Sequence, residues 1–148
     1  MRASNPDRVI TAARAWLGTP YHDQASLKGV GCDCLGLARG VWREVVGPEP
    51  FPIPPYSRDW GEIGPREALA EGARAMMIEL SPAEAGPGAL VLFRMMPRAS
   101  AKHVGILTNS ATFLHAYEGL GVIEEPLTQV WRRRIAFAFF FPMVRAGN

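Results

Sequence analysis

The sequence predicts an α+β fold in which helices come first and an antiparallel sheet follows. Apolar residues recur at helical spacing before Ser81-Pro82, whereas the apolar runs after it are short and typical of strands. The links at 108–111 and 119–121 are short enough for hairpins, which join antiparallel neighbours. A chain of 148 residues, 48% hydrophobic and 20% charged, suits one core, so we expect residues 1–148 to form a single domain.

Two helices are expected in the first third of the chain. The first begins in Ser4-Asn5-Pro6, because serine or asparagine caps a helix N-terminus and proline suits the first turn, and it ends at Gly18. The second begins at Cys34, with Asp33 as its N-cap, and stops at Gly47. The faces that we expect to be buried are Val9, Ala13, Trp16 and Leu17 in the first helix, and Leu35, Ala38, Val41, Trp42 and Val45 in the second.

The segment 47–65 is too rich in proline for a helix or a central strand, so it is predicted to be a loop. It carries the aromatic residues Phe51, Tyr56 and Trp60. A loop of this length either packs on the surface of its own domain, covers a site or docks a partner. A third helix is expected from about Pro65 to Leu80, with an apolar side made of Ala68, Leu69, Ala73, Met76 and Met77.

Strands are predicted in the second half, at Ala89–Met95, His103–Thr108, Thr112–Glu118, Gly121–Glu125 and Ile135–Phe141. The hairpin around Asn109 decides whether two histidines meet. A loop of residues 108–110 sets Leu107 opposite Ala111 and His103 opposite His115. A loop shorter by one residue would place the two imidazoles on opposite faces of the sheet. The length of this loop therefore tests whether the histidines form one site.

Cys34 is the candidate nucleophile. A thiol in the first turn of a helix faces unpaired backbone N–H groups and the positive end of the helix dipole, and both favour the thiolate. Nucleophilic catalysis by cysteine also needs an imidazole and a third polar group that orients it, and His103 and His115 are candidates for these roles. Tyr117 or Glu118, close to His115 in the sequence, is the alternative third group.

Several motifs occur in a fixed order along nearly the whole chain, from Arg8 to about Pro142. They are Asp33-Cys34-Leu35-Gly36-Leu37, Arg39-Gly40-Val41-Trp42-Arg43, Pro87-Gly88-Ala89-Leu90-Val91-Leu92-Phe93, His103-Val104-Gly105-Ile106 and His115-Ala116-Tyr117-Glu118-Gly119. In this order they resemble the NlpC-type cell-wall cysteine peptidases. More narrowly, they are similar to the branch found in phage tails and phage-derived gene transfer particles.

The resemblance implies a papain-like fold, with the nucleophile at a helix N-terminus packed against a small antiparallel sheet. It implies that Cys34 is the nucleophile, that His103 is the general base and later the acid, and that His115 holds the ring of the base. Tyr21 matches the family's tyrosine near the nucleophile, where its hydroxyl can help the Cys34 backbone N–H to stabilise an oxyanion. Asp33 is expected to cap the helix. This role is compatible with a second contact between its carboxylate and a substrate amine.

The implied reaction is hydrolysis of peptidoglycan stem peptides, commonly at the bond between D-γ-glutamate and the diamino acid. The implied setting is a phage-like tail that opens the wall locally, with tail hub or baseplate proteins as partners and no cofactor. Many relatives have serine after the cysteine, whereas this chain has Leu35. A requirement for a free N-terminal L-alanine on the stem peptide therefore stays open. The alternatives are a wall amidase or housekeeping hydrolase, and a structural tail-tip subunit with an idle site.

Composition excludes several other classes of function. A formal net charge of +2 and a pI near 8.8 are too mild to predict nucleic acid as a partner, and Arg132-Arg133-Arg134 is expected to be a solvated surface, with contact to an anionic wall polymer or a protein as the alternative. The N-terminus lacks an apolar signal-peptide core and the run 135–144 is too short to span a bilayer, so we expect a soluble protein made in the cytoplasm.

The remaining cysteine and histidine are expected to be ordinary structural or surface residues. Cys32 and Cys34 stand too close for an unstrained disulfide, which predicts reduced thiols. His22 lies in the loop before them. A zinc site built from the two cysteines with His103 and His115 departs from common zinc spacings, so no metal is expected.

Overall fold

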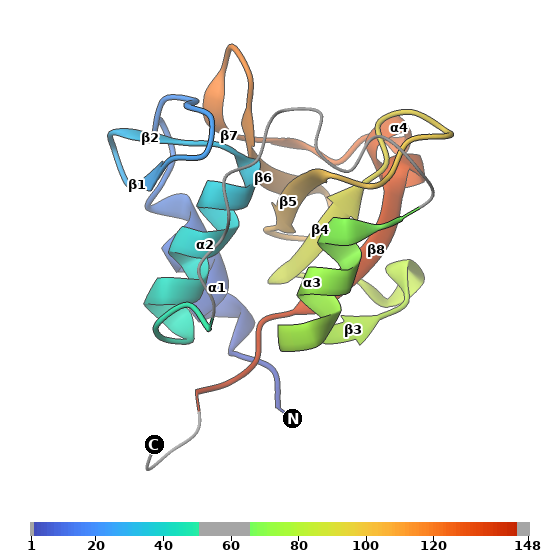
Figure 1. Cartoon of the computed structure of the whole chain (residues 1–148), viewed down its shortest axis with the longest axis horizontal. Helices are drawn as coiled ribbons and strands as arrows, with labels where there is room; N and C mark the ends of the chain where they lie inside the picture. The colour runs from blue at the N-terminus through green and yellow to red at the C-terminus, as the bar shows by residue number, and fades with distance from the viewer. Residues whose placement is uncertain (1, 51–65, 145–148) are drawn as a thin grey trace.

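A six-stranded antiparallel sheet forms the centre of the computed structural model, which describes residues 2–50 and 66–144 (Figure 1). The strand order in this sheet is β3-β8-β4-β5-β6-β7, and β1 and β2 form a separate two-stranded sheet. The helices are α1 (Pro6–Arg14), α2 (Cys34–Val45), α3 (Ala68–Met76), the 3-10 turn η1 (Pro82–Glu84) and α4 (Gln129–Arg134). The strands are β1 (Ser26–Leu27), β2 (Gly31–Cys32), β3 (Ile78–Leu80), β4 (Ala89–Phe93), β5 (His103–Leu107), β6 (Thr112–Tyr117), β7 (Gly121–Pro126) and β8 (Ile135–Phe140).

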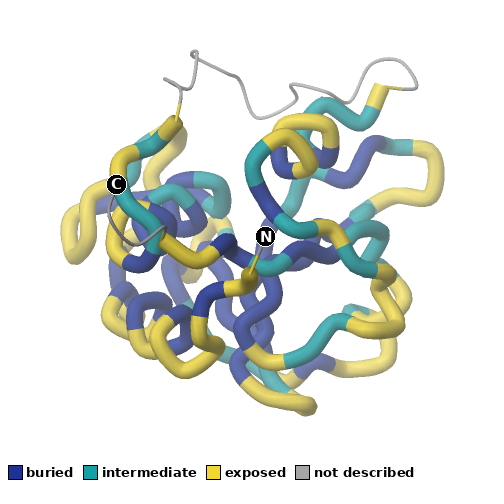
Figure 2. The backbone as a smooth tube through the Cα atoms, turned by 90° about the horizontal axis from the view of Figure 1, so that it is seen from below, coloured by how far each residue is buried: buried dark blue, intermediate teal, exposed yellow. Residues whose placement is uncertain are grey.

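The sheet has a buried cluster on each face because successive strand residues point to opposite sides. Side chains of α1, α2 and α3 pack on one face, against residues such as Leu92, Ile106 and Phe139. The other face carries Phe93 and Phe113, against which Trp131 of α4 and neighbouring residues pack. In Figure 2 the buried stretches gather in the interior and the exposed ones at the loops.

The start of α1 agrees with the sequence prediction, and its end does not. The Asn5 side chain accepts hydrogen bonds from the backbone N–H groups of Asp7 and Arg8, at 2.8 and 3.4 Å. The helix ends at Arg14, and the following residues form tighter turns that lead to Gly18. Leu17 therefore lies beyond the helical face and is 46% exposed, which corrects its expected burial.

Asp33 caps α2 as predicted, and it does more than that. Its Oδ1 accepts the backbone N–H of Gly36 at 2.7 Å, while Oδ2 accepts the backbone N–H of Gln24, also at 2.7 Å. The same carboxylate thus joins the start of α2 to the preceding loop. Gly36 allows the two to approach closely, because a Cβ there would lie 1.8 Å from the carbonyl oxygen of Ala25. Leu35, expected in the core, is only half-buried.

The third predicted helix is too long. Helix α3 ends at Met76, and Ile78–Leu80 forms strand β3, which pairs with β8 at the edge of the sheet. Pairing with an available strand overrides the helical spacing of this segment. The strands that the sequence does predict are confirmed within one or two residues of their expected ends. The short strands β1 and β2 and the helix α4 are not predicted, because two-residue strands and a six-residue helix leave little periodicity.

The hairpin between β5 and β6 has the predicted parity but a different register. Leu107 pairs with Phe113, not with Ala111, and Thr108 donates its backbone N–H to Thr112. The Asn109 side chain accepts the backbone N–H of Ala111 at 2.7 Å, so this turn closes one residue later than expected. The two histidines of these strands therefore share a face, as expected, but they are diagonal neighbours rather than directly opposed.

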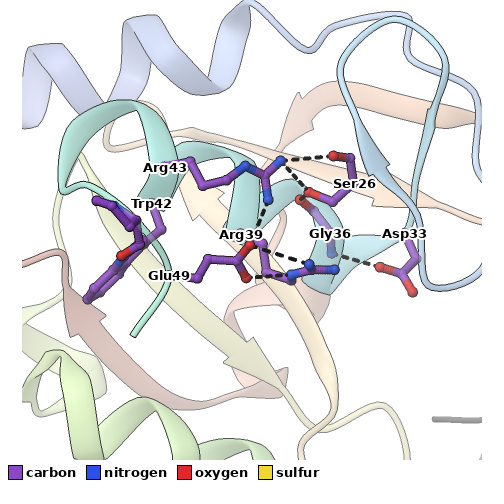
Figure 3. Close-up of polar contacts among 8 residues, drawn as sticks. Ser26, Asp33, Gly36, Arg39, Trp42, Arg43 and Glu49 are labelled. Atoms are coloured by element: carbon purple, nitrogen blue, oxygen red, sulfur yellow. Dashed lines mark hydrogen bonds and ion pairs between the residues drawn. The ribbon is translucent and has the colours of Figure 1, made fainter. Parts of the chain in front are cut away.

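Residues 51–65 of the predicted loop lie outside the described part of the chain. Glu49, which precedes them, bonds both Arg39, at 2.7 Å, and Arg43, at 3.0 Å (Figure 3).

The arginine run is largely on the surface. Arg132 and Arg133 are exposed as predicted, whereas Arg134 is half-buried, 5.1 Å from the centre of the Trp131 ring. Among the described helices, none has the length and apolar character needed to cross a bilayer.

Candidate active site

Cys34 is the first residue of α2 and lines a pocket of about 200 Å³. Helix α2 packs against β5 and β6, which brings its N-terminus to the start of β5. There the half-buried Cys34 thiol donates to the carbonyl oxygen of Lys102, with 3.8 Å between the sulfur and the oxygen. The pocket is lined by Tyr21, Asp23, Gln24, Asp33, Cys34, Leu35, Leu69, Met95, Lys102, His103, Ala116, Tyr117 and Glu118.

His103 and His115 meet on the sheet and continue into a carboxylate. His103 Nε2 lies 2.7 Å from His115 Nδ1, and His115 Nε2 lies 2.6 Å from Oε2 of Glu125. His115 is fully buried, whereas the Glu125 side chain is 30% exposed. A chain of hydrogen bonds therefore runs from the pocket, through a buried imidazole, to a carboxylate near the surface.

The sheet brings these side chains together because all of them lie on the face that carries Phe93 and Phe113. Continuing the register of the β5–β6 hairpin places His115 opposite Gly105, which has no side chain. A Cβ at Gly105 would lie 2.8 Å from the Phe93 ring and 3.1 Å from the Phe113 ring. The glycine thus leaves space for aromatic packing beside the diagonal contact of the two imidazoles.

Aromatic rings pack around the two imidazoles. The Phe113 ring centre lies 4.5 Å from that of His115, and Tyr117 stacks on His115 at 5.2 Å with an interplanar angle of 27°. Trp131 lies edge-on to His115 at 5.3 Å and 6.0 Å from His103. The low polarity of this shell disfavours a charge on either histidine.

Burial controls the protonation of the site. It lowers the pKa of His103 to about 3, and charge repulsion from His115 and Arg134 acts in the same direction. Burial also lowers the pKa of His115, against the opposing effect of the Glu125 carboxylate. Both imidazoles are therefore neutral at pH 7 in the resting protein.

The thiol is also neutral at rest. Burial raises the pKa of Cys34 to about 12; the backbone N–H of Val104 opposes this change, and the Asp33 carboxylate adds to it. The N-terminus of α2 was expected to favour the thiolate, but here desolvation outweighs the helix. At rest the pocket therefore holds a neutral thiol and a neutral imidazole.

Tyr21 and Asp33 both line the pocket with Cys34, as the sequence predicts. Burial and the nearby Cys34 and Asp33 raise the pKa of Tyr21, so its hydroxyl stays protonated and can donate a hydrogen bond. Asp33 is only 4% exposed and accepts the two backbone N–H groups described above, which confirms its capping role. Contact of Asp33 with a substrate amine stays a prediction.

Cys32 and His22 lie outside the histidine chain. Cys32 is fully buried in the core under the helices, and burial raises the pKa of its thiol to about 12. His22 is exposed, with Nδ1 3.2 Å from the carbonyl oxygen of Asp23. Within residues 2–50 and 66–144, no group of three or more His, Cys, Asp or Glu side chains is arranged to hold a metal ion.

Glu125 is the residue of this site that the sequence reasoning missed. The sequence offered Tyr117 or Glu118 as alternatives to His115 for the polar group that orients the base. In the structure, Tyr117 stacks on His115 and Glu118 lines the pocket. The signal lies in the turn between β6 and β7, which pairs Tyr117 with Gly121 and His115 with Ile123. This register puts Glu125 on the same face as His115, two residues along the neighbouring strand. Applying the argument from loop length to this second hairpin would have found it.

A profile described as the NlpC/P60 family matches residues 18–138. The chain belongs to the NlpC/P60 family. A relative from Escherichia coli (strain K12), named murein DD-endopeptidase MepS/murein LD-carboxypeptidase, is 28% identical over 128 residues, which cover 86% of this chain and 58% of the relative. The chain thus spans little more than half the length of this curated relative.

Solved structures of the same family confirm the papain-like α+β fold. The NlpC/p60 domain of the peptidoglycan hydrolase SagA superposes with a TM-score of 0.63 and 24% identity, covering 91% of this chain and 97% of that one. An NlpC/P60 family protein from Bacillus cereus ATCC 10987 also gives a TM-score of 0.63, with 20% identity over 93% of this chain and 40% of the other. The family predicted from the sequence is confirmed, and the named relatives agree with the predicted enzyme class.

Proposed function

We propose that this chain is a cysteine endopeptidase that cleaves the stem peptides of peptidoglycan, with residues 1–148 as one catalytic domain. The observation that carries the proposal is the placement of Cys34 and His103 on one pocket, with His115 hydrogen-bonded behind His103. Membership of the NlpC/P60 family supports the substrate class, and so do the names of two similar proteins, a murein endopeptidase and a peptidoglycan hydrolase.

In the proposed mechanism, Cys34 is the nucleophile and His103 the general base. The Cys34 sulfur attacks the amide carbonyl while its proton passes to His103, since both groups start neutral. The backbone N–H of Cys34 and the hydroxyl of Tyr21 stabilise the oxyanion. His103 then protonates the leaving amine, and a water molecule, activated by the same imidazole, hydrolyses the thioester. His115 holds the ring of His103 throughout.

We propose the bond between D-γ-glutamate and the diamino acid as the site of cleavage. Stem peptides of this kind carry both free carboxylates and free amines around that bond. The pocket offers partners for each, because Lys102 lines it together with Asp23 and Glu118. Leu35 lines the same pocket and offers no polar group where many relatives have serine. We therefore expect turnover to depend little on a free N-terminal L-alanine.

The proposed setting is a phage-like or gene-transfer particle, whose tail hub or baseplate would carry the domain to the cell wall. The support is the resemblance of the motifs around Cys34, His103 and His115 to that branch of the family. The connected hydrogen bonds from His103 to Glu125 favour an active enzyme over an idle structural subunit.

Purified muropeptides of defined sequence test these proposals. Mass analysis of the products should show cleavage after D-γ-glutamate, and a C34A variant should give none. Release of the whole peptide from the sugar would instead indicate a wall amidase. Equal products from wild type and C34A would refute the role of Cys34. C34A particles that assemble normally but fail to open the wall would support the particle role, whereas wild-type entry by such particles would refute it.

A further inference from the structure

His115 has both of its ring nitrogens committed to hydrogen bonds. Its Nε2 faces Oε2 of Glu125 at 2.6 Å, and its Nδ1 faces Nε2 of His103 at 2.7 Å. The His115 side chain is fully buried, so water cannot replace either partner. An ionised carboxylate only accepts hydrogen bonds, which means that His115 must donate from Nε2.

The direction of this first bond determines the second. A neutral imidazole has one N–H, and burial keeps His115 neutral by lowering its pKa. With its proton on Nε2, His115 presents a bare Nδ1 and can only accept from His103. His103 must then donate from Nε2. Because His103 is neutral as well, its Nδ1 is left with a free lone pair.

We infer that Glu125 is a positioning residue which, through His115, selects the tautomer of His103 that leaves Nδ1 free as the base for Cys34. The inference rests on the proposed function of Cys34 and His103 and goes beyond it by assigning the proton positions. In the opposite tautomers, His115 would donate from Nδ1 to His103 Nε2 and present a bare Nε2 to the Glu125 carboxylate, and His103 would carry its proton on Nδ1. That proton would block the transfer from the thiol, although every ring would occupy the same place.

Glutamine at position 125 tests the acceptor-only character of the carboxylate. Its amide has nearly the same shape, but it can donate as well as accept, so it permits both tautomers of His115. The matched control is Glu124→Gln, which removes an equal charge from the neighbouring residue of β7. Glu124 points to the opposite face of the sheet, where it binds Arg14 at 2.9 Å.

The direct measurement is the ¹⁵N NMR spectrum of the imidazoles in the unliganded protein. Wild type and E124Q should show His103 and His115 protonated at Nε2 and bare at Nδ1. E125Q should show a mixture of tautomers for both rings. E125D, which keeps the acceptor, should restore the wild-type pattern in part. A wild-type protein with the His115 proton on Nδ1 would overturn the inference, whatever the folding of the variants.

Kinetics on muropeptides provides the second readout. E125Q should lower kcat by roughly 10- to 100-fold with little change in KM, because it alters the base and not the substrate contacts. E124Q should keep the wild-type kcat. Unchanged kcat and an unchanged NMR pattern in E125Q, with C34A inactive, would refute the role of Glu125 alone. Full activity of C34A would refute the proposed function, while the NMR pattern would still decide the tautomers.

Discussion

Acid should destabilise this protein through His103, and a His103→Gln variant should lose that sensitivity. Burial lowers the pKa of His103 to about 3, from the ordinary value of 6.5. Between these values the unfolded chain binds the proton and the folded protein does not, so stability rises with pH. The stabilisation is complete above about pH 6.5 and is lost as the pH falls from there toward 3. Glutamine can still donate to His115 Nδ1, so the variant keeps a bond while it removes the titration.

The size of the effect follows from the shift. Each pH unit between the two pKa values changes the free energy of unfolding by about 1.4 kcal/mol. Lowering the pH from about 6.5 to about 4 should thus remove about 3 kcal/mol of stability from the wild type through this one group. Carboxylates such as Glu49 and Glu124 titrate in wild type and variant alike, so their effects cancel in the difference.

Urea unfolding, followed by circular dichroism at a series of pH values between 4 and 7, measures that difference. The stability of wild type relative to H103Q should fall by about 3 kcal/mol over the series. His22→Gln controls for the loss of a histidine, because His22 is exposed and lies outside the site. A constant difference between wild type and H103Q would show that His103 is not held neutral by burial.

Three further predictions concern single side chains. Cys34→Ala should abolish muropeptide cleavage with an unchanged circular dichroism spectrum, whereas Cys32→Ser should keep most activity; preferential alkylation of Cys32 together with an active C34A would reject the assignment. His103→Ala should remove nearly all turnover and His115→Ala should leave more, because an orienting residue contributes less than the base; equal rates in a fixed-time assay would contradict this order. Asp33→Ala should lower the free energy of unfolding by about 2 kcal/mol, since two backbone N–H groups lose a charged acceptor; an unchanged urea midpoint would show that these bonds contribute nothing.

Parts of the site could be read from the sequence because they depend on near neighbours. Asp33 caps α2 within three residues of its own position, and the positions of β5 and β6 follow from local apolar patterns. The shared face of His103 and His115 needs only the parity of one short loop. Which residues lie directly opposite the two histidines could not be predicted in this way, because Asn109 closes its turn one residue later than the sequence suggested.

What the sequence by itself determined is therefore the family and the α+β order of elements, and it predicted that Cys34, Tyr21, His103 and His115 form one site. Only the tertiary structure decided the diagonal contact of the histidines, the role of Glu125 as their last hydrogen-bond partner, and the neutral state of the thiol. Caps, turns and strand parity involve residues a few positions apart. Burial and cross-strand contacts exist only after distant segments pack, and it is packing that partly buries Cys34 and His103 and keeps both groups neutral.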